Sequence, residues 1–152
     1  MGQNVVRVAL HFVWATRDRL PLVEPEMERR LYRYVTQVCE DDKCPVLAIG
    51  GMPDHVHLLV NYAATISMSD LMRHVKGGSS RFVSDILCPG QWFQWQESYG
   101  VFCVEPNNQT NLIAYIANQK HHHAQSKTWP NVEATSLDFP VPAKAVTRPK
   151  AT

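Results

Sequence analysis

Two histidines one residue apart are the first candidates for chemistry in this chain. His55 and His57 lie in a run that ends Leu-Leu-Val, which is typical of a β-strand. Because side chains alternate along a strand, both imidazoles point to one face, while Val56 and Leu58 point to the other. No cysteine or second histidine pair of zinc-finger spacing lies nearby, so the pattern predicts an open metal site. Histidines in strands are also common as satisfied core residues or surface residues.

A helix expected over residues 111–123 carries the second candidate group. Its apolar positions recur at helical spacing and are Leu112, Ile113, Ile116 and Ala117. Its polar positions follow one another on a second face and are Asn111, Tyr115, Gln119 and His122. Tyrosines on helices usually pack, with the hydroxyl at the surface. In a chain with a His-x-His strand, however, Tyr115 lies one turn from the potential oxygen ligand Gln119, which suggests a nucleophile beside a metal.

The two motifs together resemble those of a known family. His55-Val56-His57, preceded by Met-Pro-Asp, resembles the HUH motif (His, hydrophobic, His), and the stretch from Tyr115 to Gln119, followed by Lys-His-His, looks like the tyrosine motif of the same superfamily. In this order they resemble the single-tyrosine HUH transposases of bacterial insertion sequences, the TnpA-like and REP-associated tyrosine transposases. The resemblance spans nearly the whole chain.

The resemblance implies a DNA transposase. Such an enzyme binds DNA hairpins, then cleaves and rejoins single-stranded DNA through a 5′-phosphotyrosine intermediate. It further implies that Tyr115 is the nucleophile, that His55, His57 and Gln119 bind Mg²⁺ or Mn²⁺, and that the protein works as a homodimer. Sequence does not decide whether Tyr115 serves its own histidines or those of a partner chain.

Two other functions remain open. One is a domesticated relative that binds repeat or hairpin DNA without mobilising it, because such a protein would retain the same residues. The other is a non-catalytic RRM-like RNA-binding module. That module would place base-stacking aromatic residues on its central strands, where this chain has His55 and His57.

Hydrophobic patterning predicts an α+β fold. Strands are expected over residues 5–16, 44–52, 54–61 and 99–104. Helices are expected over residues 25–42, 67–86 and 111–123, the second capped by Ser67 and interrupted by Gly77-Gly78. The order predicts a ferredoxin-like or RRM-like antiparallel sheet with helices, plus a C-terminal helix that carries the tyrosine.

Three smaller expectations concern the neighbourhood of the histidines. His11, inside the first strand, is expected to be structural or to support the site indirectly. Gly50-Gly51 is expected to form a bend or bulge. Asp54 is expected to point away from the metal and to support the turn, because strand alternation puts it opposite His55.

A basic stretch near Gly77-Gly78 is the candidate DNA-contacting surface. Together with Lys120, its cationic and hydroxyl side chains are expected to bind phosphate oxygens; the residues are Arg73, Lys76, Ser79 and Arg81. The alternative is an ordinary solvated helix face with a kink. The net charge is only +1, but residues 107–127 contain no acidic residue, so local basic faces remain compatible with DNA binding.

Aromatic residues gather between residues 91 and 97, where Trp92, Phe93 and Trp95 occur. Exposed aromatic rings can stack on unpaired bases. The more ordinary expectation is that these rings pack into the core.

Length and composition indicate one globular domain. The chain has 152 residues, of which 45% are hydrophobic. We expect residues 1–127 to form the transposase domain and residues 128–152, which include four prolines, to form a tail. With no apolar run of membrane-spanning length and no signal peptide pattern, a cytoplasmic location is expected. The four cysteines are expected to be free thiols, with a Cys39/Cys44 zinc site as a minor alternative.

Overall fold

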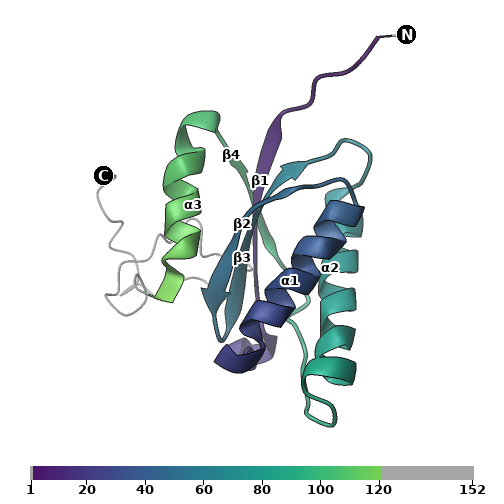
Figure 1. Ribbon diagram of the computed structural model, residues 1–152, viewed down its shortest axis with the longest axis vertical. Coiled ribbons are helices and arrows are strands. Elements are labelled where there is room, and N and C mark those ends of the chain that lie inside the picture. Colours follow the sequence, from purple (N-terminus) through teal and green to yellow (C-terminus); the bar gives the residue numbers. More distant parts are fainter. Residues whose placement is uncertain (1, 121–152) are drawn as a thin grey trace.

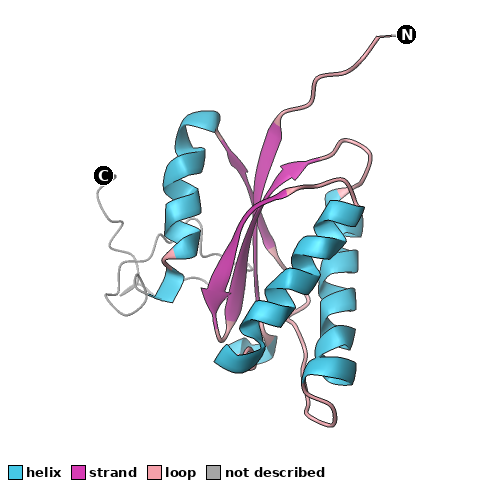
Figure 2. Ribbon diagram, in the orientation of Figure 1, coloured by secondary structure: helices cyan, strands magenta, loops and turns pink. Residues whose placement is uncertain are grey.

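The computed structural model describes residues 2–120, which build a four-stranded sheet with helices on both faces (Figure 1). The strands are β1 (Val8–Ala15), β2 (Val46–Met52), β3 (His55–Tyr62) and β4 (Gly100–Val104). The α-helices are α1 (Pro25–Asp41), α2 (Met68–Phe82) and α3 (Gln109–Ala117). Figure 2 shows α1 and α2 together on one side of the sheet and α3 on the other.

The strands run in the order β2-β3-β1-β4, and every neighbouring pair is antiparallel. This order and the β1-α1-β2-β3-α2-β4 succession are those of a ferredoxin-like fold, so the predicted α+β class is confirmed. β3 and β1 are the central strands. The His-x-His strand therefore has a paired neighbour on each side.

Alternation along the central strands divides the core into two clusters. The larger cluster packs under α1 and α2, and its strand residues include Leu10, Phe12, Trp14, Val56, Leu58 and Val60. The smaller cluster packs under α3 and consists of Ala9, Leu59, Leu112, Tyr115 and Ile116. The strand residues of the two clusters alternate, as the period of two requires.

Helix α2 differs from the prediction, because it continues through Gly77-Gly78 without a break. The expected interruption was wrong, and of the two glycines only Gly78 has a role in tertiary packing. A Cβ on Gly78 would lie 2.7 Å from the hydroxyl of Tyr34 on α1, so the missing side chain lets the two helices approach. The predicted cap is confirmed, since the Ser67 hydroxyl accepts a hydrogen bond from the Asp70 amide at 3.0 Å.

The glycine pair at Gly50-Gly51 also differs from the prediction. Both residues lie inside β2 and pair with β3, opposite His57 and Val56. The irregularity in this pairing falls instead between Val46 and Ala48. A bend at the glycines is therefore absent, and their role is to allow close contact, as the site shows below.

The aromatic segment packs in the main. Phe93 and Trp95 are buried, whereas Trp92 keeps 58% of its surface exposed. The Trp95 indole donates a hydrogen bond of 2.9 Å to the Ser79 hydroxyl.

Cys39 is a buried free thiol, and burial raises its pKa to about 12. Within the described residues, no helix has the length and apolar character needed to cross a membrane.

Candidate active site

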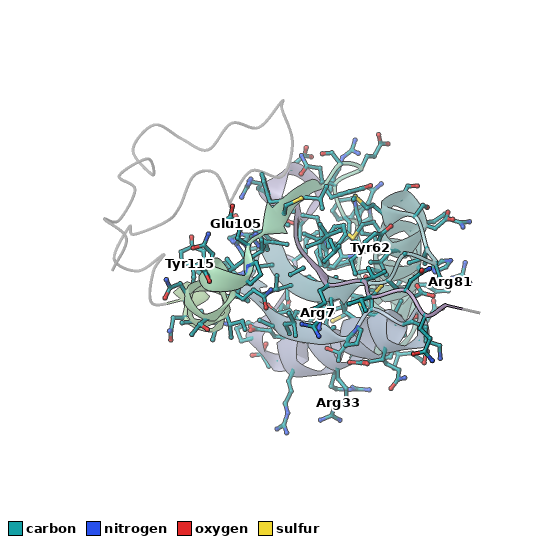
Figure 3. The ribbon with its side chains drawn as sticks, turned by 90° about the horizontal axis from the view of Figure 1, so that it is seen from above. Arg7, Arg33, Tyr62, Arg81, Glu105 and Tyr115 are labelled. Carbon is teal, nitrogen blue, oxygen red and sulfur yellow. The ribbon has the colours of Figure 1, made fainter. Side chains whose placement is uncertain are left out.

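The candidate site lies between the sheet and α3. His55 and His57 are both buried, and strand alternation places them on the α3 face, while Val56 and Leu58 face the larger core. Figure 3, seen from above, shows Tyr115 on α3 at one side of the molecule and Arg81 at the opposite side. The tyrosine and the main basic stretch therefore lie on different sides of the sheet.

Helix α3 brings Tyr115 to the sheet, but it ends at Ala117, earlier than the expected range of 111–123. Gln119 therefore lies just beyond α3, after the turn at Asn118, and reaches the same site. Both side chains are 2% exposed, and they share the buried face with Leu112 and Ile116. The prediction of separate apolar and polar faces was wrong on this point. Leu112, Tyr115, Ile116 and Gln119 follow the i, i+3, i+4, i+7 pattern of a single stripe, and Ala117 is exposed. The polar ends of Tyr115 and Gln119 are thus buried together with the apolar side chains of Leu112 and Ile116.

Gly50 permits the close approach of α3, and its role was not recognised from the sequence. A Cβ on Gly50 would lie 2.3 Å from the carbonyl oxygen of Ile116, which no real contact allows. Gly50 pairs with His57 across the β2-β3 ladder, so this contact lies directly beside the histidine. A glycine inside a strand often marks such an approach, and that was the available signal.

His55 is held between a carboxylate and an amide. Its Nδ1 lies 2.7 Å from Asp54 Oδ1, and its Nε2 lies 3.2 Å from Gln119 Oε1. Asp54 thus contacts the side of the His55 ring that faces away from Gln119, but not for the reason expected from strand alternation. Asp54 precedes β3 and lies in the turn, where strand alternation does not apply. Its backbone carbonyl does support the turn, by accepting a hydrogen bond of 2.9 Å from the Thr16 amide.

His57 contacts a third buried histidine. Its Nδ1 lies 2.8 Å from His11 Nε2. The ring of Tyr115 also packs edge to face against the ring of His57, with the two centroids 6.0 Å apart. His11 is thus in contact with a candidate ligand, as a supporting residue would be. Tyr115 lies beside the histidines of its own chain.

The donor set fits a divalent cation. Since a carboxylate only accepts, the Asp54 contact requires the proton on His55 Nδ1. A neutral His55 then presents a lone pair at Nε2 to Gln119 Oε1, which is also an acceptor and lies 3.2 Å away. With the amide oxygen turned toward His55, the space between these two acceptors suits a second proton on His55 or a cation. Adjacent ligands of an octahedral cation at about 2.1 Å are roughly 3 Å apart, which matches this separation.

The amide orientation of Gln119 supports this assignment, because its Nε2 donates to the Tyr115 carbonyl at 3.5 Å, which turns Oε1 toward His55. Among the described residues, no group of three or more His, Cys, Asp or Glu side chains could hold a metal ion. The Gln119 oxygen is a further polar atom, and it lies beside His55 Nε2. The Cys39/Cys44 pair has no third ligand of those types within the same range of residues.

The predicted DNA-contacting residues do not form one surface. Arg73 and Arg81 on α2 are exposed, and Arg73 pairs with Asp70 at 3.1 Å. Lys120 is exposed and bonds to Glu28 at 2.7 Å. Ser79 is fully buried and takes the Trp95 hydrogen bond, so in this conformation its hydroxyl faces the core rather than a phosphate.

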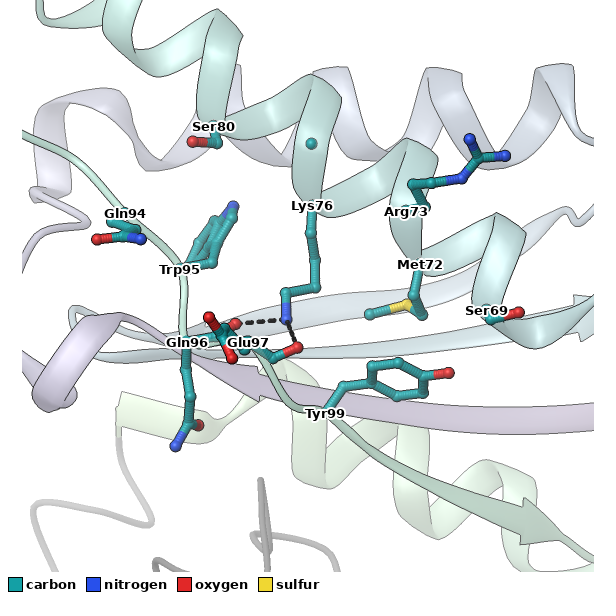
Figure 4. Close-up of a pocket in the computed structure, with 11 residues that line it drawn as sticks. Ser69, Met72, Arg73, Lys76, Ser80, Gln94, Trp95, Gln96, Glu97 and Tyr99 are labelled. Carbon is teal, nitrogen blue, oxygen red and sulfur yellow. Dashed lines mark hydrogen bonds between the residues drawn. The ribbon is translucent and has the colours of Figure 1, made fainter.

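Lys76 lies in a pocket between α2 and the segment before β4 (Figure 4). Its ammonium group donates to the carbonyl oxygens of Gln96, Glu97 and Ser98, the latter two at 3.0 Å. Burial lowers its pKa to about 8, an effect that the nearby carboxylate of Glu97 partly offsets. Lys76 therefore ties a loop to α2 in this structure, and a phosphate would have to compete with three carbonyl groups.

Comparisons with known proteins identify the family of the chain. Residues 4–119 match the family model for IS200-like transposases. The chain is 26% identical over 122 residues to the ISDra2 transposase TnpA of Deinococcus radiodurans, covering 76% of this chain and 86% of the relative.

Two solved structures share the fold. A protein from Deinococcus radiodurans R1 that was designated a transposase superposes with a TM-score of 0.61 at 27% identity, covering 78% of this chain and 96% of that chain. A REP-associated tyrosine transposase bound to a REP hairpin superposes with a TM-score of 0.59 at 14% identity, covering 81% of this chain and 72% of that chain. From the family match over most of its length, we conclude that the chain belongs to the IS200-like transposase family.

Proposed function

We propose that this protein is an insertion-sequence transposase that binds hairpin DNA ends, then cleaves and rejoins single-stranded DNA through a 5′-phosphotyrosine intermediate. Tyr115 is the proposed nucleophile, and His55, His57 and Gln119 are the proposed ligands of Mg²⁺ or Mn²⁺. One observation carries the proposal. Tyr115 and Gln119, four residues apart, are buried, with Tyr115 against the ring of His57 and Gln119 against His55.

Tyr115 supplies the nucleophile of the covalent step. The Tyr115 oxygen forms a bond to phosphorus, the bond from phosphorus to the 3′ oxygen breaks, and the phenolic proton ends on the released 3′ hydroxyl. The phosphodiester energy is kept in the tyrosyl ester, so a later 3′ hydroxyl can reverse the step and join strands. An ordinary tyrosine has a pKa of about 10, so the phenol needs help in losing its proton.

A bound divalent cation supplies Lewis-acid stabilisation of the charge that develops on the phosphate oxygens. Asp54 orients His55 toward such an ion, as carboxylates commonly do for ligating histidines. Two imidazoles and an amide oxygen are softer than the ligands that Mg²⁺ prefers, so Mn²⁺ is the better chemical match.

DNA has to reach a tyrosine that is 2% exposed. We therefore propose that α3 shifts relative to the sheet when DNA binds. A homodimer, as the family resemblance implies, would let such a helix serve either its own histidines or those of a partner chain. The exposed cations Arg73, Arg81 and Lys120 are the proposed phosphate contacts.

Hairpin ends are the proposed DNA partner, supported by the fold shared with a transposase that was solved on a REP hairpin. The RNA-binding alternative is weakened by the sheet itself. The α3 face of the central strands carries His11, His55 and His57, all buried, where an RRM-like module needs exposed aromatic rings.

The test is a covalent-adduct assay. The purified protein is incubated with labelled single-stranded DNA from the flanks of its own gene and with Mg²⁺ or Mn²⁺, and then resolved on a denaturing gel. We expect a protein-linked band that disappears in Tyr115→Phe. If His57 is a metal ligand, the band should also disappear in His57→Ala. Tyr34→Phe is the matched control, because Tyr34 lies between α1 and α2, and it should keep the band.

Persistence of the band in Tyr115→Phe would overturn the nucleophile assignment. Undiminished cleavage in His57→Ala and in the presence of a chelator would overturn the metal role. Hairpin binding on a native gel without any adduct would identify a domesticated DNA-binding relative instead.

A further inference from the structure

The contact between His11 and His57 has the geometry of a directed hydrogen bond. His11 Nε2 and His57 Nδ1 are 2.8 Å apart, and the ring planes differ by only 12°. The ring centroids are 5.0 Å apart. The centroid distance exceeds the distance between the two nitrogens by about one ring width, which requires the two nitrogens to lie nearly on the line between the centroids. The rings therefore meet edge to edge and lie in nearly one plane. Both side chains are fully buried.

The sheet register builds this contact. His57 pairs with Val13, and His11 pairs with Leu59, so the two histidines are diagonal neighbours on the same face of adjacent strands. Such neighbours are within reach of ring side chains. Phe102, which pairs with His11 on β4, packs its ring 6.0 Å from the His11 centroid. The orientation of His11 is therefore constrained from both neighbouring strands.

The hydrogen bond couples the tautomers of the two rings. Only one proton can lie between His11 Nε2 and His57 Nδ1. If His57 donates, its Nε2 carries a lone pair and can bind a metal, and the His11 proton lies on Nδ1. If His11 donates, a neutral His57 carries its proton on Nε2 and cannot be a ligand through that atom. The choice of donor thus decides whether His57 can serve the site.

We propose that His11 is a positioning residue that accepts a hydrogen bond from His57 Nδ1 and thereby holds His57 in the tautomer that binds a metal through Nε2. The proposal rests on the ligand role given to His57 above. It assigns different supports to the two ligands, since His55 donates to the carboxylate of Asp54 and His57 donates to an imidazole. Partners of this kind fix the orientation of a ligand and contribute to affinity.

Two substitutions separate positioning from packing. His11→Phe keeps a ring against Phe102 but leaves the His57 donor without an acceptor. His11→Gln offers a carbonyl oxygen that can accept the same hydrogen bond. His74→Gln is the matched control, because His74 lies exposed on α2 and bonds to Asp42.

The first readout is Mn²⁺ affinity of the full-length, DNA-free protein, measured by electron paramagnetic resonance titration. We expect His11→Phe to weaken binding about 10- to 100-fold, His11→Gln to recover most of it, and His74→Gln to match the wild type. Equal affinity in His11→Phe and the wild type would overturn the proposal. So would an equal loss in His11→Phe and His11→Gln.

The second readout needs no metal. Nitrogen-15 chemical shifts of the histidine rings report the tautomer of each ring. We expect His57 of the metal-free wild type to carry its proton on Nδ1 and to lose this preference in His11→Phe. A wild-type His57 protonated on Nε2 would overturn the proposal even if a variant failed to fold. A wild type with the expected tautomer but no Mn²⁺ binding would count against the proposed metal role, while leaving the His11–His57 bond supported.

Discussion

The face of the sheet under α1 and α2 is lined by large apolar side chains, whereas the face under α3 carries three buried histidines beside a small apolar cluster. Adjacent residues of one strand belong to different faces. Leu58 lies in the larger cluster, while His57 and Leu59 face α3. The period of two thus lets a single strand be anchored by one face and present ligands on the other.

The two helical layers differ in the same way. α1 and α2 bury continuous apolar stripes, and the contact between them is tightened by Gly78 against Tyr34. α3 and the residues that follow it bury two polar side chains, Tyr115 and Gln119, beside a small apolar cluster. We infer that the first face contributes most of the stability and that the second is held weakly enough for α3 to shift.

The largest effect on the site is expected from Gly50→Ala. The added methyl group would meet the Ile116 carbonyl at 2.3 Å, so α3 has to move away from β2. A displacement of about 1 Å can cost roughly 100-fold in rate, and adduct formation measures this loss. The fold should survive, because the α1/α2 face is untouched.

Gly77→Ala is the matched control, since nothing lies within 4 Å of its added methyl group. It should stabilise α2 by up to about 1 kcal/mol without changing the activity. If Gly50→Ala kept wild-type activity, the close packing of α3 would not be a requirement of the site.

The next largest effect is expected on the free energy of unfolding of Leu58→Ala and Leu59→Ala. Both leucines are fully buried in the wild type. Truncation of a buried leucine costs about 2–5 kcal/mol. We expect Leu58→Ala to lie in the upper part of this range, because its cavity opens in the larger cluster, and Leu59→Ala to lie near the lower end. Denaturant unfolding gives both free energies.

Hydrogen exchange sharpens this comparison. Leu59→Ala should raise the exchange of α3 amides more than that of α1 and α2. Equal unfolding free energies with uniform exchange would contradict the division of the protein into a stabilising face and a weakly held face.

A smaller effect concerns Lys76, a charged group on the stabilising side. Burial lowers its pKa to about 8 in the folded state from 10.5 in the unfolded chain. Between these values the unfolded chain binds more protons, so rising pH favours the folded state. Relative to Lys76→Met, the wild type should therefore gain stability from pH 8 to pH 10.5 and show no change from this group below that window.

Thermal unfolding of both proteins across the same pH values checks this sign. The stability difference between the wild type and Lys76→Met should grow in favour of the wild type as the pH rises. A difference that stays constant or shrinks would show that burial does not disfavour the charged form of Lys76.

The smallest effect is expected from Lys120→Ala. Lys120 joins the end of α3 to Glu28 on α1, but its side chain is 58% exposed, and exposed ion pairs contribute at most about 1 kcal/mol. Unfolding should change by less than that, while DNA binding at low salt weakens if Lys120 is a phosphate contact. A larger loss of stability would mean that the ion pair, rather than the apolar cluster, holds α3.

The sequence was enough to predict the order of the elements and the pairing of His55 with His57 on one face. Both depend on periodicity, which is local. Tyr115 was assigned to the correct helix but to the wrong kind of face, and Gln119 lies beyond the end of that helix. The spacing of apolar residues along a helix does not show whether a tyrosine at the edge of the apolar face is buried. That depends on the strands that pack against the helix, and these are distant in the sequence.

Features that depend on distant contacts could not be read from the sequence. Gly50 and Gly78 looked like breaks in regular structure, yet each is a point of close approach to another element. Asp54 was assigned by strand alternation, which ends at the turn where it lies. Ser79 was grouped with surface cations, but Trp95, sixteen residues later, buries it. The tail assigned to residues 128–152 lies outside the described residues.

The most direct measurement of the central claim is to locate the DNA on the protein. The covalent complex formed with single-stranded DNA is digested with a protease and a nuclease, and the modified peptide is sequenced by mass spectrometry. The account predicts a nucleotide joined through its 5′ phosphate to Tyr115. A nucleotide on any other residue, or joined through a 3′ phosphate, would contradict it.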